Sequence, residues 1–429
     1  MKFLRKFLPH RFEYQDVADH AGRALKWWIL GGAALQIVTA ASIVTYDQFR
    51  KRRIPGGFEG FPHLPPTSAE LAGNELTVYT NGQQLYDDML KAINEAEHSV
   101  FFESFIWKGD DTGKAFKEAM INAAARGVHV YCIYDTFANL VVNPAFKIFP
   151  HLENLHILRF PILRPDMFLI KGRLFGRDHR KLLIVDGKVG WVGGYNIGDL
   201  YATEWRDTQI KIEGPAVWEL ENAFVEFWNE FKRPHHPELP DRGARAWDSR
   251  IQAVANTPSR LTFPIRGHYL DAIARASKQI LITQAYFIPD REFIDALKRA
   301  AKRGVEVKIL IPERSNHVLA DWAAATTFTE LLDAGIQIWL YQHAMVHAKT
   351  ATIDGRWTTV GTANIDRLSL QGNFEVNVIL TGKEPAQVME KVFLKDMSTA
   401  RELKLKKWAN RPRFWLLIER IVRPMRFWL

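Results

Sequence analysis

The amino-acid sequence predicts an α/β protein whose body consists of two similar lobes that follow one another along the chain. Three observations support this fold class: β-rich and helical segments alternate, a set of residues recurs 168 positions later, and a connection rich in proline and charge lies between the copies. The chain has 429 residues, of which 47% are hydrophobic and 24% charged. It is therefore long enough for more than one domain and too apolar to be disordered as a whole.

The first predicted element is a transmembrane helix over residues 27–46, which follows a basic N-terminal segment, residues 1–26. The span carries no charge over 20 residues, which matches the thickness of a bilayer core. Trp27, Trp28 and Tyr46 lie at its ends, where aromatic rings favour the headgroup level. A cleaved signal peptide and a buried core helix are the alternatives, and the acidic residues before the span argue against the first.

The segment after this helix, residues 47–74, is rich in proline and glycine and is predicted to be a linker. It begins with four basic residues at positions 50–53, whereas three basic residues closely precede the span. By the positive-inside rule this difference slightly favours a cytoplasmic body. The sequence thus predicts a single-pass protein of the cell membrane.

Each lobe begins with the signals of a β-α-β unit. In the first lobe, residues 75–232, β-rich runs at 99–107 and 128–135 flank a helical segment at 112–126. In the second lobe, residues 259–400, runs at 279–287 and 305–312 flank a helical segment at 292–303. Gly127 and Gly304 are expected to end the two helices. Residues 233–258 form the predicted connection between the lobes.

The later parts of the two lobes match more closely. Shifting residues 179–196 by 168 positions places them on residues 347–364 without a gap, and seven of the 18 positions are identical. The identical pairs are His179 and His347, Lys181 and Lys349, Asp186 and Asp354, Gly187 and Gly355, Val192 and Val360, Gly193 and Gly361, and Asn196 and Asn364. The same shift places Asp207 on Glu375. The pattern indicates an internal duplication.

The repeated polar residues suit phosphodiester chemistry at one cleft. The lysines and asparagines, Lys181, Lys349, Asn196 and Asn364, are donors for the non-bridging oxygens of a phosphate, and they need no metal for this. One histidine is able to attack phosphorus while the other protonates the leaving alcohol, because imidazole titrates near neutrality. Asp207 and Glu375, each 28 residues after its histidine, are expected to accept the Nδ1 proton and so orient Nε2.

Asp186 and Asp354 are expected to act mainly in the scaffold. Each is followed by glycine between two β-like runs, and Asp-Gly is typical of a hairpin turn. The aspartates would hold that turn or pair with a neighbouring cation. A duplication that retains only structural residues is the alternative for the whole set, but no turn requires histidine, lysine and asparagine together.

The charge distribution favours anionic lipid over nucleic acid as the partner. The net charge of +9 divides into +5 in residues 1–60, +7 in the basic aromatic tail, residues 401–429, and −3 in the body, where a nuclease would usually carry its basic stripe. In the tail, Trp415, Ile418 and Val422 share one helical face, which either lies at a membrane interface or completes the core of the second lobe. Cys132, the single cysteine, excludes an internal disulfide and a thiolate metal cluster. We expect no metal and no cofactor.

The two motifs resemble the paired HKD motifs of the phospholipase D superfamily. The resemblance rests on RDHRKLLIVDG (177–187) with GGYN (193–196), and on VHAKTATIDG (346–355) with GTAN (361–364). WRD (205–207) and NFE (373–375) are similar to elements of its bacterial cardiolipin synthase branch. Two features depart from the family: Thr362 stands where serine is frequent, and one spanning helix is evident where many cardiolipin synthases have two.

The resemblance covers roughly residues 75–400 and implies a pseudo-twofold pair of lobes with one active site between them and a covalent phosphohistidine intermediate. The catalytic residues that it implies are His179, Lys181, Asp186, His347, Lys349 and Asp354. His179 would be the nucleophile and His347 the general acid and base, although the reverse assignment stays open.

The sequence therefore predicts a membrane-bound phosphatidyltransferase that makes cardiolipin from phosphatidylglycerol or a related phospholipid. Three alternatives stay open: a phospholipase D that hydrolyses phospholipids to phosphatidic acid, a phosphodiesterase or nuclease of the same superfamily, and a catalytically inactive membrane scaffold. The expected partners are phospholipid substrates and the membrane, without nucleic acid, and the sequence leaves the oligomeric state open.

Overall fold

The computed structural model describes residues 61–163, 176–241, 243, 248–342 and 344–424. The predicted transmembrane helix at 27–46 and the segment before it lie outside this range. The chain divides into two compact units, residues 1–56 and 57–429, and all of the described residues lie in the second. Within the described residues, no helix has both the length and the apolar character that a membrane span needs.

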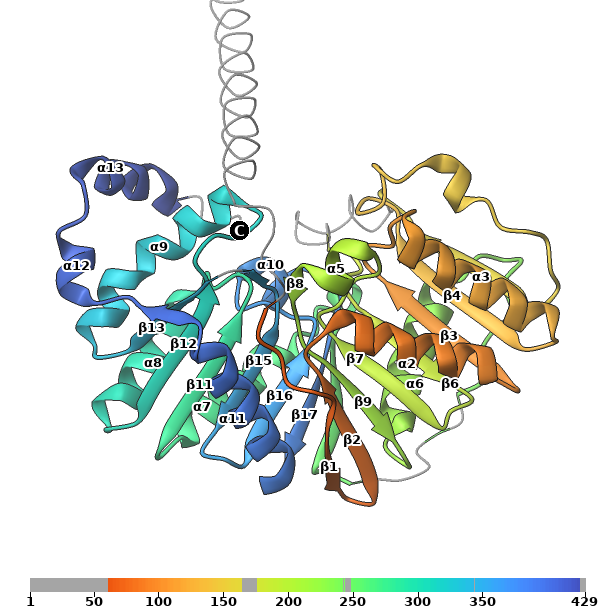
Figure 1. Cartoon of the computed structure of the whole chain (residues 1–429), viewed down its shortest axis with the longest axis horizontal. Coiled ribbons are helices and arrows are strands. Elements are labelled where there is room, and N and C mark those ends of the chain that lie inside the picture. Colours follow the sequence, from red (N-terminus) through yellow and green to blue (C-terminus); the bar gives the residue numbers. More distant parts are fainter. Residues whose placement is uncertain (1–60, 164–175, 242, 244–247, 343, 425–429) are drawn as a thin grey trace, which may run out of the picture. The chain divides into compact units, whose positions relative to one another are not determined.

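The first lobe contains an eight-stranded sheet in the order β1-β2-β9-β7-β6-β3-β4-β5 (Figure 1). Its strands are β1 (Thr67–Leu71), β2 (Asn74–Tyr79), β3 (Ser99–Ser104), β4 (His129–Asp135), β5 (Leu155–Phe160), β6 (Leu182–Val185), β7 (Val189–Gly193) and β9 (Gln209–Glu213). Its helices are α2 (Gly82–Glu95), α3 (Asp111–Ala125), α5 (Asp199–Thr203) and α6 (Val217–Phe231), with a 3-10 turn at Pro144–Lys147.

The second lobe contains an eight-stranded sheet in the order β10-β17-β16-β15-β11-β12-β13-β18. Its strands are β10 (Ile251–Asn256), β11 (Gln279–Gln284), β12 (Glu306–Pro312), β13 (Gln337–Tyr341), β15 (Lys349–Ile353), β16 (Trp357–Gly361), β17 (Glu375–Thr381) and β18 (Ala400–Glu402). Its helices are α7 (Pro264–Arg275), α8 (Arg291–Lys302), α9 (Val318–Asp333), α10 (Arg367–Gln371), α11 (Lys383–Met397), α12 (Leu405–Ala409) and α13 (Arg413–Val422), with a 3-10 turn at Pro258–Arg260.

The two sheets share seven strands in the same order, which confirms the predicted α/β architecture of two similar lobes. Lobe one adds β1 at one edge of this common sheet, and lobe two adds β18 at the opposite edge. The predicted β-α-β units are also confirmed, because β3 pairs with β4 and β11 with β12 in parallel. Both crossover helices begin at an aspartate whose side chain accepts from a backbone N–H, Asp110 before α3 and Asp290 before α8. Gly127 and Gly304 follow the two helices with φ of 98° and 90°, a conformation that glycine adopts without strain.

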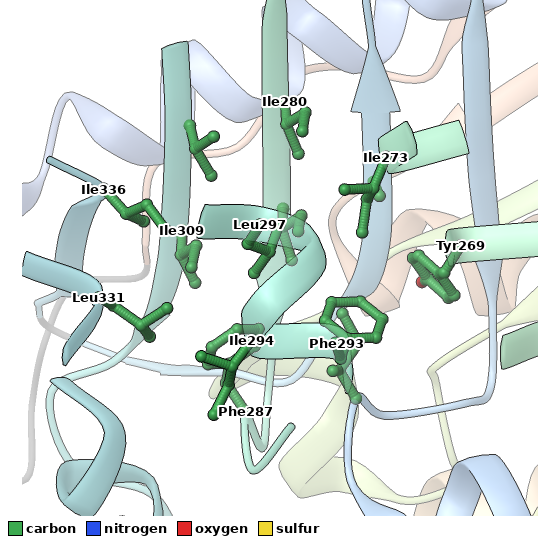
Figure 2. Close-up of a cluster of buried hydrophobic side chains, with 14 of the residues drawn as sticks. Tyr269, Ile273, Ile280, Phe287, Phe293, Ile294, Leu297, Ile309, Leu331 and Ile336 are labelled. Atoms are coloured by element: carbon green, nitrogen blue, oxygen red, sulfur yellow. The ribbon is translucent and has the colours of Figure 1, made fainter. Parts of the chain in front are cut away.

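Side chains of the central strands alternate between the two faces of each sheet, and they are buried on both faces. In β3, Val100 and Phe102 pack in the cluster that includes α2 and α3, whereas Phe101 packs in the cluster that includes α6. In the second lobe, isoleucines of β11 and β12 pack under α7, α8 and α9, and Figure 2 shows ten labelled members of that cluster. Hydrophobic residues of β16, β17 and α11 join the cluster formed by β2, β9 and α6, so one core continues from lobe to lobe.

Three predicted boundaries need correction. The linker expected at 47–74 contains β1, whose residues Thr67–Leu71 pair with β2 in an antiparallel ladder. The connection expected at 233–258 contains β10, which pairs with β17 and so opens the second lobe before residue 259. The tail expected from residue 401 contributes the end of β18 to the second sheet. β10 and β18 pair with strands distant in sequence, of which local composition carries no signal, whereas β1 forms a hairpin with β2, the strand that follows it.

The C-terminal tail packs on the second lobe through α13. Val422 is buried in the core cluster of that lobe, Ile418 packs against it, and the rings of Trp415 and Trp322 of α9 meet edge to face. The helical face that the sequence pointed out therefore completes the core. The opposite side of α13 exposes Phe414, Leu416, Leu417 and Ile421.

Candidate active site

Backbone pairing between the lobes brings the two motifs together. The two-residue strand β8 (Trp205–Arg206) of the first lobe pairs in parallel with β14 (Met345–Val346) of the second lobe. The equivalent contact with the lobes exchanged is a parallel bridge between Asp178 of the first lobe and Phe374 of the second. The His347 N–H donates to the Arg206 carbonyl at 2.7 Å, and the His179 N–H donates to the Phe374 carbonyl at 3.0 Å. Each histidine is thus held by the segment that precedes the acid of the opposite lobe.

The histidine–acid pairs consequently cross between the lobes. His179 Nδ1 lies 2.9 and 3.0 Å from the carboxylate oxygens of Glu375, and His347 Nδ1 lies 2.6 Å from Asp207 Oδ2. All four side chains are buried. The sequence places each acid 28 residues after the histidine of its own lobe, but the structure pairs it with the other histidine. Because Nδ1 faces an acid, Nε2 of each ring is the nitrogen left for a substrate.

Both motif lysines are buried beside the histidines. Lys181 Nζ donates to the His179 carbonyl at 2.6 Å, while Lys349 Nζ donates to the His347 carbonyl and lies 2.9 Å from His347 Nδ1. An ammonium group has three N–H donors, so each lysine retains donors for a further oxygen. Burial lowers the pKa of Lys181 to about 7 and that of Lys349 to about 8.

The pKa values of the histidines and acids of the site are also shifted from their usual values. Burial lowers the pKa of His347 to about 3 and holds the pKa of His179 well below its usual value. Burial raises the pKa of Glu375 to about 8. Burial would also raise the pKa of Asp207, but Lys349, His347 and the hydrogen bond from His347 outweigh it and keep that pKa below its usual value. The pKa values of both histidines are therefore lowered in the free protein, and those of their acid partners are shifted in opposite directions.

The motif asparagines are buried near the histidines but differ in their hydrogen bonds. Asn196 Oδ1 accepts from the Ile106 N–H at 3.2 Å, and its carbonyl accepts from the hydroxyl of Tyr86. Asn364 is 4% exposed, and its Oδ1 has no hydrogen-bond partner among the described residues. A buried amide oxygen without a partner is costly, which is a frequent sign of a group that meets a ligand.

Aromatic rings and an additional acid surround the site, and sequence reasoning did not single them out for that role. The ring of Phe105 lies 4.7 Å from the His179 ring, and those of Trp205 and Tyr286 lie 5.0 and 6.3 Å from the His347 ring. Asp366 caps α10 by accepting from the Ser369 N–H at 2.6 Å, and burial raises its pKa to about 7. Only proximity in the fold reveals these residues, since Phe105 and Tyr286 follow strands without any motif.

Asp186 and Asp354 lie apart from this group. Asp186 follows the last residue of β6 whereas Lys181 precedes the first, so a four-residue strand separates the aspartate from the site. Its carboxylate accepts from the backbone N–H groups of residues 97–99, and Asp354 binds residues 277–279 in the same way. Each aspartate has φ of 54° and is followed by a glycine near 60° in a tight hairpin turn. The structure thus places these two motif residues in the scaffold.

The flanks of the two histidines differ in charge. Next to His179, the Arg180 guanidinium pairs with Glu103 at 2.6 Å and lies 3.6 Å from Asp178, and all three side chains are buried. Next to His347 stand Val346 and Ala348, which pack in a small apolar cluster. The described residues contain no group of three or more histidine, cysteine, aspartate or glutamate side chains arranged to hold a metal ion.

Comparison with known proteins identifies the family. Residues 89–231 and 269–397 match the family model described as "Cardiolipin synthase, PLD-like domain". The major cardiolipin synthase ClsA of Bacillus subtilis (strain 168) is 34% identical over 366 residues, which are 81% of this chain and 74% of the relative. A cardiolipin synthase of Clostridium perfringens (strain 13 / Type A) is 33% identical over 380 residues, 82% of this chain and 77% of the relative.

A solved structure shows the same fold at low sequence identity. Phosphatidylserine synthase from Haemophilus influenzae Rd KW20 matches with a TM-score of 0.62 and 12% identity, over 88% of this chain and 97% of that chain. This likeness supports the two-lobe α/β architecture alone. The family model and the relatives confirm the resemblance that the paired motifs indicated. The chain therefore belongs to the phospholipase D superfamily, in its cardiolipin synthase family.

Proposed function

We propose that the protein is a phosphatidyltransferase that makes cardiolipin from phosphatidylglycerol or a related phospholipid through a phosphohistidine. The observation that supports this most strongly is the pair of crossed histidine–acid contacts at 2.6 and 2.9 Å, which bring two oriented imidazoles into one site. Membership of the cardiolipin synthase family supports the choice of product. No other candidate function has a specific observation in its favour.

In the first half of the reaction, Nε2 of His179 attacks the phosphorus of the donor phospholipid. The new P–N bond forms as the P–O bond to the donor headgroup breaks, and His347 Nε2–H gives its proton to the departing oxygen. With phosphatidylglycerol as donor, the leaving alcohol is glycerol. Glu375 and Asp207 act as positioning residues, because each contacts the Nδ1 side of its histidine.

In the second half, the acceptor alcohol resolves the phosphohistidine. His347, now neutral, removes the proton from a hydroxyl of a second phosphatidylglycerol, whose oxygen attacks phosphorus as the P–N bond breaks. The net change joins two molecules of phosphatidylglycerol into cardiolipin and releases one glycerol, and both histidines regain their initial protonation. Lys181 and Lys349, with Asn196 and Asn364, would donate to the non-bridging oxygens as negative charge builds there.

Substrate binding supplies the protonation that this mechanism requires. The free site is deficient in positive charge, because burial lowers the pKa of both lysines and both histidines. A phosphodiester brings a full negative charge among these groups and so raises their pKa values. The ionised Asp207 beside His347 favours a proton on that imidazole, which is why we assign the general acid role to His347.

We further propose that the enzyme acts at the cell membrane, held by the hydrophobic span at 27–46 with the catalytic body on the cytoplasmic side. The absence of charge over that span and the four basic residues at 50–53 support this placement. A membrane anchor keeps the body beside its lipid substrates.

The test is to incubate the purified full chain with defined phospholipids and resolve the products by mass. Cardiolipin with an equimolar amount of glycerol is the expected result from phosphatidylglycerol alone. Phosphatidic acid as the main product would replace the transferase with a hydrolase. If neither forms while H179A and the unmodified chain behave alike, the protein is not a catalyst of this class.

A further inference from the structure

The large hydrophobic side chains that the described residues leave exposed are unevenly distributed. Ten of the thirteen lie in the segment 137–163, on α10 or on α13; the ten are Phe137, Leu140, Val141, Ile148, Leu163, Leu368, Phe414, Leu416, Leu417 and Ile421. We call these ten side chains the apolar rim. Figure 1 shows α13, α10 and the yellow segment after β4 along the same upper edge of the view, with β8 between them. The rim thus spans both lobes on the edge where the motifs meet.

The part of the rim in the first lobe is held in place from inside. Asn139 is 2% exposed, and its side chain bonds the backbone of residues 105, 107 and 135, while Lys147 Nζ donates to its carbonyl at 2.5 Å. Between these anchors, Leu140 and Val141 are 56% and 85% exposed. The loop therefore turns the polar side chain of Asn139 inward and the apolar side chains of Leu140 and Val141 outward, the opposite of an ordinary surface loop.

This loop also contacts the wall of the active site. Asn139 Nδ2 donates to the carbonyl of Phe105, whose ring lies against His179. Asp135, the last residue of β4, pairs with Arg177 at 2.8 Å, and the ring of Phe137 lies under the same guanidinium. The apolar loop is therefore linked by direct contacts to the first motif.

In the second lobe, a chain of contacts through α9 connects the apolar rim to His347. Tyr286, whose ring lies near His347, donates its hydroxyl to Asn316, just before α9 begins. The C-terminal helix α13 packs on α9 through Trp415 and Trp322. Leu368 lies on α10, which begins three residues after the motif residue Asn364.

The charge around the rim identifies the kind of surface that it fits. The loop at 136–149 carries one lysine and no acid, and residues 404–424 carry seven basic residues and one acid. That acid, Glu419, is paired with Arg411 at 2.7 Å. Apolar side chains interspersed with lysine and arginine are typical of segments that lie in the interface of an anionic bilayer.

We infer that the apolar rim docks the catalytic body onto an anionic phospholipid surface, so that the site opens directly toward lipid headgroups. In choosing a lipid surface the inference rests on the proposed function, but its first test makes no reference to turnover. The contact is made by the body itself, in addition to any anchor at residues 27–46. The rim side chains would enter the headgroup boundary, while the histidines stay at the level of the phosphates.

The full chain allows a direct test with single cysteine labels. Its only cysteine, Cys132, is fully buried, and burial raises the pKa of its thiol, so it stays unreactive. V141C and L417C place a small environment-sensitive fluorophore on the two parts of the rim. L394C is the matched control, because Leu394 is 58% exposed, close to the 56% of Leu417, but lies on α11 away from the upper edge (Figure 1).

In vesicles of phosphatidylcholine and phosphatidylglycerol, we expect lipid-borne quenchers to reduce emission at 141 and 417 several-fold more than at 394, with the reverse order for aqueous iodide. Equal quenching at all three positions would overturn the inference. A change that depends on protein concentration and occurs without lipid would also overturn it, because it would show contact between two copies of the chain.

A second measurement separates docking from chemistry. The ratio of turnover on vesicles to turnover on dispersed short-chain phosphatidylglycerol should fall several-fold in the double variant V141S/L417S and stay constant in L394S. An unchanged ratio in the double variant would contradict the inference. If the labels enter lipid but the unmodified chain makes no cardiolipin, the proposed function fails while the docking surface stands.

Discussion

The two lobes present the same motif residues on different structural supports. His179 is flanked by a buried ionic cluster of Glu103, Asp178 and Arg180, whereas His347 is flanked by Val346 and Ala348 in an apolar cluster. Both supports nevertheless bring an imidazole to within 3 Å of an acid from the opposite lobe. The polar motif residues are thus the same in both lobes, while the packing behind them differs.

The two acids that contact the histidines, Asp207 and Glu375, also have different surroundings. Asp207 lies close against Gly194, where an added Cβ would come within 2.0 Å of its Oδ1. At the equivalent position of the second lobe, Thr362 donates its hydroxyl to Glu375 at 2.5 Å. Burial raises the pKa of Glu375 to about 8, while Asp207 is kept below its usual pKa by its charged neighbours, even though burial opposes this. The near-symmetric geometry thus provides the histidines with unequal partners, as separate roles require.

The largest expected effect breaks the equivalence of the two histidines. H179A should lose at least about 10²- to 10⁴-fold in turnover and form no covalent intermediate, because the nucleophile is gone. H347A should lose turnover over a similar range but retain slow formation of a phosphoenzyme, since Nε2 of His179 remains. Acid quenching and detection of the modified histidine by mass distinguish them. A trapped phosphoenzyme in H179A, with none in H347A, would reverse the assignment.

The next effect concerns the ionic support of the first lobe. E103Q leaves the buried Arg180 without its main counter-charge, and breaking a buried pair in this way typically destabilises a protein by about 3–5 kcal/mol. The paired replacement E103L/R180M removes both charges and should cost clearly less. Urea unfolding of the two variants measures the difference. Equal destabilisation would mean that the cluster contributes through packing and not through charge.

A feature could be predicted from the sequence when the residues that specify it are close together in the chain, and could not when they are far apart. The β-α-β units and the Asp-Gly turns are specified by residues near one another, so their patterns were readable and are confirmed. β10 was hidden in a segment that resembles a linker, because its pairing partner β17 lies more than 100 residues away. β1 pairs with the strand that follows it, but the proline- and glycine-rich composition before it masked the hairpin. The repeat of 168 residues revealed the polar residues of the site but not the crossing of the histidine–acid pairs. That crossing depends on backbone contacts between the lobes, such as His179 with Phe374.

Replacing Asp207 and Glu375 by their amides tests which step of the proposed reaction each acid assists. D207N and E375Q should each reduce turnover by about 10- to 100-fold, the range usual for groups that orient a reacting imidazole. Because the pairs cross, E375Q should slow formation of the phosphoenzyme through His179. D207N should weaken proton transfer by His347 and displace the alkaline limb of the pH–rate profile for phosphoenzyme formation to lower pH, because the general acid must be protonated in that step. If each variant instead affected the step of the histidine in its own lobe, the crossed assignment would be wrong.

The smallest expected effect concerns Asp186 and Asp354, which make the same backbone hydrogen bonds in the two lobes. D186N and D354N each remove the charge that holds three backbone N–H groups at the start of β3 or β11, and each should lower the free energy of unfolding by about 1–3 kcal/mol. Turnover per folded molecule should change little, because a strand separates both aspartates from the histidines.

The pH dependence of that cost has a definite sign. Burial tends to raise the pKa of both carboxyls, but the backbone donors outweigh it, so both pKa values lie below the ordinary value in the folded protein. Their stabilisation is therefore fully present above the unfolded pKa of about 3.9 and is lost as pH falls through the lower folded pKa. The difference in unfolding free energy between the unmodified chain and either variant should be constant from about pH 7 to 5 and shrink below about pH 4. Denaturant curves over this range measure it, with L394S as a surface control. A folded but inactive D186N would place this aspartate in the chemistry, and a large effect in only one of the two variants would show that the lobes differ here as well.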